Sequence, residues 1–220
     1  MESIEIIYDH YKETFSLSKD AQARRNRNFV ILCVLEALSF LILIKPEKAF
    51  EIIANGINSE LNLTLSLGTS IIQTLIWILI AYVSIRYVQD MMYIERQYGY
   101  MDKLEKQISA SIEYHNWFSR EGDHYKERYP MVLNFIELFY KILMPILFVV
   151  INSVHIYKEY MFEKAMTWTM ACDTILYVAI FIIMWFYFFE IHSKITAFFK
   201  KHIPLINKIS IILRKWLREV

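Results

Sequence analysis

The sequence has little of what sheets and disulfide-bonded domains require. Its 220 residues include only 4 glycines and 4 prolines, and folds built of many short strands need such turn residues between the strands. The two cysteines, Cys33 and Cys172, lie in apolar runs, so they are interpreted as small buried side chains and not as a disulfide. The N-terminal segment is acidic and amphipathic, which argues against a cleaved signal peptide. These shortages favour a few long helices.

Hydrophobic residues are abundant instead and make up 56% of the chain. They are concentrated in four long runs, at about 28–44, 63–85, 131–154 and 165–189. A helix needs about 20 apolar residues to cross a bilayer core, and only a helix satisfies the backbone of a single span in lipid. The sequence therefore predicts an all-α fold, a four-helix transmembrane protein with cytoplasmic helical extensions.

Positive charges show how these spans are oriented, although the net charge is only +1. Lysine and arginine number five before the first span, seven between the second and third, and seven after the fourth. The two other connections carry two each, which makes nineteen against four. Basic loops stay in the cytoplasm. We therefore predict a multi-pass protein of the inner (plasma) membrane with both termini cytoplasmic.

The predicted organisation has five segments. A cytoplasmic N-terminal helix (1–27) is followed by transmembrane helices 1 and 2 (28–85), a cytoplasmic helical region (86–130), transmembrane helices 3 and 4 (131–190) and a basic amphipathic C-terminal helix (191–220). The residues from 45 to 62 are expected to be a connecting loop. The C-terminal helix is expected to lie on an anionic inner leaflet or to pack against the other cytoplasmic helices.

The helix predicted after the second span has an apolar stripe at steps of three and four residues, so it must be buried against another element. The N-terminal helix is one candidate partner, and the same helix of a neighbouring subunit is the other. Gly99 costs the helix about 1 kcal/mol relative to alanine without ending it. The stripe consists of Met91, Ile94, Tyr98, Met101, Leu104, Ile108 and Ile112, and the N-terminal face of Ile4, Ile7, Tyr8, Tyr11 and Phe15.

Two basic clusters are candidates for binding an anionic ligand or for gating, because guanidinium and ammonium groups bind phosphates. Their alternative role is to anchor the chain at the lipid headgroups. The first cluster is Arg24, Arg25 and Arg27, and the second, in a polar hairpin before Pro130, is Arg120, His124, Lys126 and Arg128.

Polar side chains inside the spans are the other candidates, because such groups are costly in lipid and face a bundle interior or water. They either hold a monomeric bundle together or line a pore in a homo-oligomer. Lys141 is expected to pair with Glu137 one turn away, whereas His155 is expected to flank its span in isolation. The pore-lining or intramembrane polar candidates are Glu36, Gln73, Asn134, Glu137, Lys141 and Asp173.

No nucleotide-binding, metal-binding or catalytic motif stands out, so we expect no enzyme, no metal site and no cofactor. The first 110 residues form a predicted helix, two spans and a helix, with the basic run 23–29 (ARRNRNF) and the Tyr-rich leader 8–12 (YDHYK). This arrangement resembles the SLATT-type membrane effectors of bacterial anti-phage defence systems. The resemblance covers about half of the chain, and the sequence departs from it by adding two spans.

The resemblance implies a pore that responds to a nucleotide or oligonucleotide signal or to a partner sensor protein, and that depolarises the membrane in abortive infection. It carries over no catalytic or ligand residue. The first functional hypothesis is therefore an oligomeric inner-membrane channel or pore, gated through its cytoplasmic helices. The alternative is a non-conducting membrane anchor or scaffold that recruits a cytoplasmic partner.

Overall fold

The computed structural model describes residues 2–61, 69–111, 131–162 and 166–191. Every element in these ranges is a helix, and no strand occurs among them. Four of the helices are long and apolar enough to cross a membrane. The prediction of an all-α protein with four transmembrane helices is therefore confirmed.

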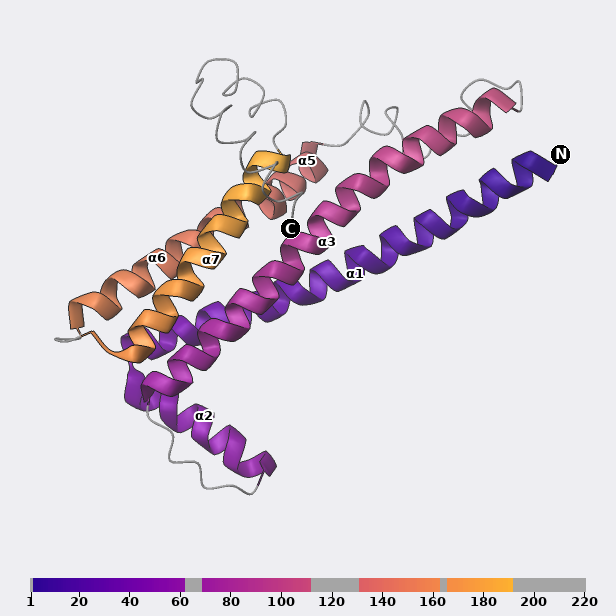
Figure 1. Cartoon of the computed structure of the whole chain (residues 1–220). Helices are drawn as coiled ribbons and strands as arrows, with labels where there is room; N and C mark the ends of the chain where they lie inside the picture. Colours follow the sequence, from indigo (N-terminus) through magenta and orange to yellow (C-terminus); the bar gives the residue numbers. More distant parts are fainter. Residues whose placement is uncertain (1, 62–68, 112–130, 163–165, 192–220) are drawn as a thin grey trace, which may run out of the picture.

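Two helices of 43 residues each, α1 (Glu2–Ile44) and α3 (Thr69–Ser111), run side by side in opposite directions along the whole molecule (Figure 1). One half of this pair packs against α6 (Met144–Phe162) and α7 (Trp168–Ile191), and the other half projects beyond them. We call the projecting half (2–27 and 90–111) the stalk. The remaining parts of α1 and α3 form the bundle with α6 and α7. The bundle thus has a stalk end and an opposite, far end.

The stalk is held together by the stripe that the sequence predicts on α3. Its partner is the N-terminal helix of the same chain, the first of the two predicted alternatives. Gly99 does not interrupt α3, whereas Tyr8 is 40% exposed and lies off the packed face. The buried stalk residues are Tyr11, Met101, Leu104 and Ile108, with Ile7, Phe15 and Tyr98 packed against them.

Segment ends follow the helix-breaking residues. No glycine or proline occurs between residues 2 and 44, so the predicted N-terminal helix and first span merge into α1. The helix stops before Pro46, because a proline disfavours the helical conformation of the residue before it. The loop prediction for 45–62 is wrong, since Pro46 opens a further helix, α2 (Pro46–Leu61). Proline is favoured at such a first position, and Glu47 in the first turn complements the helix dipole.

The third span also differs from its prediction as one helix from 131 to 154. The structure divides it into α5 (Met131–Leu138), a π-helical turn η1 (Phe139–Leu143) and α6. Pro145 follows the π turn and has no N–H, so the carbonyls four and five residues before it need donors from neighbouring helices. Tyr87 of α3 donates to the Tyr140 carbonyl at 2.8 Å, and Tyr187 of α7 donates to the Lys141 carbonyl at 3.2 Å. Beyond the expected end, α6 continues to Phe162 and carries further residues into the bundle.

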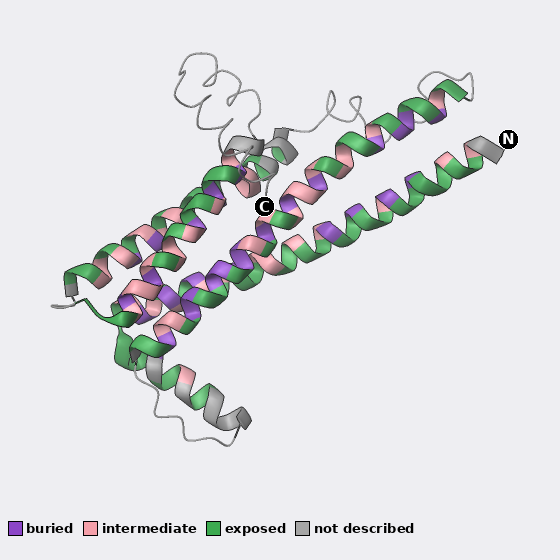
Figure 2. Ribbon diagram, in the orientation of Figure 1, coloured by how far each residue is buried: buried purple, intermediate pink, exposed green. Residues whose placement is uncertain are grey.

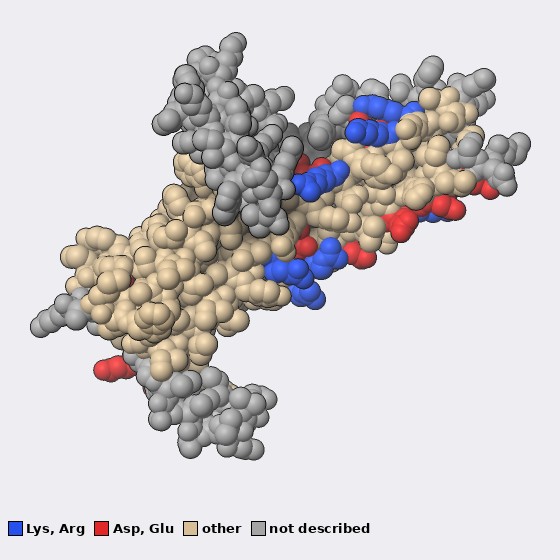
Figure 3. All heavy atoms as spheres, viewed as in Figure 1, with Lys and Arg blue, Asp and Glu red and all other residues tan. Residues whose placement is uncertain are grey.

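The bundle has an apolar core and an apolar outer surface. Leu32, Trp77, Phe148, Ile180 and Met184 are buried between the helices, and Figure 2 shows buried positions along the faces where the helices meet. The outer faces are also apolar and nearly free of charge in Figure 3, whereas lysine, arginine and acidic side chains gather on the stalk. A lipid-facing surface on the bundle and a water-facing surface on the stalk account for this division.

Candidate functional site: a polar column inside the bundle

Glu36, in the middle of the first span, is 3% exposed and faces α6. Its Oε1 accepts a hydrogen bond of 2.6 Å from the Asn152 Nδ2. The same amide nitrogen donates to the Phe148 carbonyl at 2.7 Å, which fixes the orientation of the amide. Asn152 is itself 1% exposed. The acidic group of α1 is thus held by a helix of the same chain.

A second polar pair lies one helical turn nearer the far end. Ser39 Oγ and His155 Nδ1 are 2.6 Å apart and share a hydrogen bond whose direction depends on the imidazole tautomer. Both residues are 2% exposed, and the indole ring of Trp77 lies 5.3 Å from the imidazole ring. The expectation that His155 flanks the third span in isolation is therefore wrong. The longer α6 carries it into the bundle.

The far end of the bundle brings together polar residues from three helices. Asp173 of α7 is 1% exposed. Its carboxyl group interacts with Gln73 and Thr74 of α3 and with Glu159 of α6. Two acidic side chains therefore face each other next to an amide and a hydroxyl group. We call the set of Glu36, Asn152, Ser39, His155, Glu159 and Asp173 the polar column.

At the levels of Glu36 and His155, three atoms of this column have no hydrogen-bond partner among the described residues. They are Glu36 Oε2, Asn152 Oδ1 and His155 Nε2, and each is shielded from the outside of the molecule. Buried polar atoms are almost always satisfied, and internal water is the usual partner where protein provides none. The column thus has the donor and acceptor atoms of a hydrated interior.

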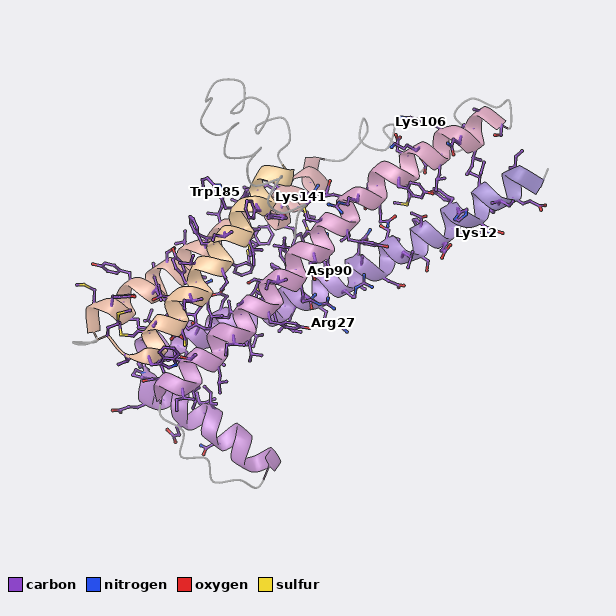
Figure 4. All side chains as sticks on the ribbon, in the orientation of Figure 1. Lys12, Arg27, Asp90, Lys106, Lys141 and Trp185 are labelled. Atoms are coloured by element: carbon purple, nitrogen blue, oxygen red, sulfur yellow. The ribbon has the colours of Figure 1, made fainter. Side chains whose placement is uncertain are left out.

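The stalk end of the bundle carries a layer of ion pairs. Asp90 of α3 accepts hydrogen bonds from Arg24 Nε at 3.3 Å and from Asn28 Nδ2 at 2.8 Å, both on α1. Lys141 of η1 forms an ion pair with Glu95 of α3. Figure 4 labels Asp90 and Lys141, which mark this level of the molecule. The layer ties the π turn and α1 to the same helix of the stalk.

Aromatic rings separate this charged layer from the polar column. The Phe29 ring lies 5.0 Å from Tyr140, 6.2 Å from Tyr87 and 6.3 Å from Phe148, measured between ring centroids. The Arg25 guanidinium lies 5.3 Å from the centroid of the Tyr140 ring on the stalk side. We call Phe29, Tyr87, Tyr140 and Phe148 the aromatic plug.

The structure brings together several of the intramembrane candidates. Gln73 and Asp173 meet at the far end, and Glu36 lies buried at mid-depth. Lys141, expected to pair with Glu137 on its own helix, forms an ion pair with Glu95 on another. The side chains of Asn134 and Glu137 lie outside the described residues.

The basic candidates of the first cluster differ in their contacts and exposure. Arg24 binds Asp90, Arg25 stacks on Tyr140, and Arg27 is exposed on the stalk surface. In the second cluster, all the members lie outside the described residues: Arg120, His124, Lys126 and Arg128.

Sequence reasoning missed four residues of the column: Ser39, Asn152, His155 and Glu159. A signal was present, because Glu36 and Ser39 are three residues apart on one span, and so are Asn152 and His155 on another. Residues three apart lie on the same face of a helix. Two such polar pairs in two apolar runs indicate facing helices, but only the packing shows that these two runs are neighbours.

Comparisons of the chain with family models, with curated proteins and with solved structures give no match.

Proposed function

We propose that the chain is a gated membrane channel whose cytoplasmic stalk receives the signal that opens it. The observation that carries this proposal is the continuity of α1 and α3. Each runs without a break from the stalk into the bundle, so a displacement of the stalk is transmitted as a rigid movement to the helices that carry Glu36 and Trp77.

The charged layer attaches α3 to α1 and to the π turn. Asp90 and Glu95 of α3 hold α1 and η1 respectively. A shift of α3 along its axis therefore pulls on Lys141 and on the π turn that contributes Tyr140 to the aromatic plug. A gate requires an element that can pack in two ways that differ little in free energy. We propose that the π turn is this element.

Assembly into a homo-oligomer and placement in the bacterial inner membrane, with the stalk in the cytoplasm, belong to the same proposal. The orientation rests on the distribution of lysine and arginine. The role in anti-phage defence, with a nucleotide signal or a sensor protein as partner, rests on the resemblance of the first 110 residues to SLATT-type effectors.

A non-conducting anchor is the second candidate, and one observation favours it. Glu36 is bonded to Asn152 inside one bundle, so it holds helices together without facing an axis between subunits. On this alternative, Glu36→Gln weakens the folded bundle and leaves the ion permeability of the membrane unchanged.

The test uses full-length chain in lipid vesicles that carry a K⁺ gradient and a potential-sensitive dye. Met101 is 1% exposed in the stalk core, so Met101→Asp buries an unpaired charge there and releases the stalk. We expect Met101→Asp to raise ion flux by about 5- to 150-fold, the range of typical allosteric coupling. Gln107→Asp is the matched control, because Gln107 is exposed on the same helix.

The milder Ile108→Ala replaces Met101→Asp if the latter does not elute as a folded protein in size-exclusion chromatography. The decisive comparison is with protein-free vesicles. If vesicles with folded wild-type protein and vesicles with folded stalk-released protein are both equally impermeable to K⁺, Na⁺ and protons, the channel proposal is refuted and the anchor proposal remains.

A further inference from the structure

We propose that the permeating ion is the proton, and that it travels along the polar column inside each bundle and not between subunits. This inference rests on the proposed channel function and adds to it the ion and the route. Three kinds of observation carry it: the chemistry of the column, its unpaired atoms and the plug at its stalk end.

The column contains groups that take up and release protons at successive levels. On α6, His155 follows Asn152 by three residues and Glu159 follows His155 by four. A rise of about 1.5 Å per residue puts these levels roughly 4.5 and 6 Å apart along the helix. Glu159 and Asp173 occupy the far end, His155 the next level, and Glu36 the level beside Asn152. One water molecule is enough to bridge an interval of this length.

The unpaired atoms complete this route. His155 uses Nδ1 for Ser39, which leaves Nε2 as its buried unpaired nitrogen among the described residues. A proton that arrives from water at one ring nitrogen leaves from the other to Ser39 Oγ, which passes its own proton on. Only N–H and O–H bonds form and break, and every group returns to its starting state once it reorients. Glu36 Oε2 is the unpaired acceptor at the end of this proton-transfer route.

The composition of the column selects against metal cations. A hard cation such as Ca²⁺ takes 6–8 oxygen ligands when it sheds its water. The levels of Glu36 and His155 instead offer two polar side chains each. Leu32, Trp77 and Phe148 belong to the apolar core at this depth. A proton needs only a chain of donors and acceptors, which this interior provides.

The aromatic plug closes the column toward the stalk. Phe29 precedes Glu36 by seven residues on α1, about two turns of helix. Its ring contacts Tyr87, Tyr140 and Phe148 of the other elements. The proposed route is therefore a half-channel that admits protons from the far end as far as Glu36. Release of the stalk withdraws the plug and joins the half-channel to the cytoplasm.

The first test measures water access to the half-channel and does not require opening. In a background in which Cys33 and Cys172 are alanine, Ser39→Cys places a thiol in the column. A small membrane-impermeant methanethiosulfonate reagent is added to intact cells that express the full chain. We expect the thiol to react from the outside. Phe40→Cys is the matched control, because Phe40 is 45% exposed on the lipid-facing side of the same turn, and it is expected not to react.

The second test measures proton flux in vesicles that contain a pH-sensitive dye, with the membrane potential clamped and the stalk released by Met101→Asp. Removing a proton-transferring side chain lowers transfer rates by about 10²-fold or more, so Glu36→Gln and His155→Leu are expected to abolish most of the flux. Glu36→Asp keeps a carboxyl group and is expected to restore part of it. Glu47→Gln, which changes an exposed residue of α2, is expected to have no effect.

The outcomes separate this inference from the channel proposal. Reaction of Ser39→Cys, together with proton flux that requires Glu36 and His155, supports the inference. K⁺ or Na⁺ flux, or proton flux that is unchanged in Glu36→Gln and His155→Leu, overturns the proton route and leaves the channel intact. Folded protein that conducts no ion at all overturns the channel and, with it, the route.

Discussion

Leu104→Ala tests whether the stalk is an independently opening part of the molecule. Leu104 is 5% exposed and belongs to the stalk core with Tyr11, Met101 and Ile108. This core is separate from that of the bundle, which is centred on residues such as Trp77. The substitution therefore removes packing that only the stalk uses.

The size of the effect follows from the volume removed. Leucine loses three carbon atoms on becoming alanine, and each buried methylene contributes about 0.8 kcal/mol. Measured leucine-to-alanine changes in cores cost about 2–5 kcal/mol, with the smaller values where the site can collapse. Two helices alone can move together easily, so we expect about 2–3 kcal/mol for opening of the stalk. At 1.36 kcal/mol per factor of ten, this equals about 30- to 150-fold faster amide exchange.

The assay is hydrogen exchange followed by mass spectrometry on the full chain in lipid nanodiscs. Peptides from the stalk are expected to exchange faster, whereas peptides from the bundle are expected to keep their rates. Tyr100→Ala is the control, because Tyr100 is 46% exposed on the same helix. A surface change of this kind is usually within about 0.5 kcal/mol, so exchange should change by little more than twofold.

Two results would contradict this reasoning. Equal acceleration in stalk and bundle would show that α1 and α3 unfold as one cooperative unit along their whole length. No acceleration in the stalk would show that Leu104 is not buried there. The proposed transmission of stalk movement through α1 and α3 would then lose its basis.

The contacts at the stalk end of the bundle provide two further predictions. Tyr87→Phe removes the hydroxyl that binds the Tyr140 carbonyl, and should destabilise the folded chain by about 0.6–1.5 kcal/mol in detergent unfolding; Tyr82→Phe, at an exposed position, should change nothing. Asp90→Ala removes both hydrogen bonds that α1 donates to this carboxyl group, and should cost about 1.5–3 kcal/mol. An unfolding midpoint equal to that of wild type would show that neither bond forms in the membrane-embedded protein.

The sequence by itself determined the class of the elements and the number of membrane-spanning helices. Four apolar runs, separated by Lys45-Pro46 and by polar connections, specify four spanning helices because lipid leaves the backbone no other partner. The sequence also predicted that the apolar stripes of the two stalk helices are buried, since an apolar face at helical spacing must pack against another element. The loop predicted at 45–62 shows the limit of this reasoning, because Pro46, which ends one helix, is also well suited to begin the next.

Only the tertiary structure decided which polar groups meet. Glu36 had no partner visible on its own helix, and Asn152 and His155 were ordinary residues at the end of an apolar run. The contacts between them depend on how α1 is rotated about its axis relative to α6. A helical pattern does not determine this rotation, because any polar position of a span could face the interior. Lys141 shows the same dependence. A π turn changes the register of its helix, and the ion pair with Glu95 follows from the packing of η1 against α3. Packing against specific neighbours, and not the periodicity of any one helix, assembled the polar column.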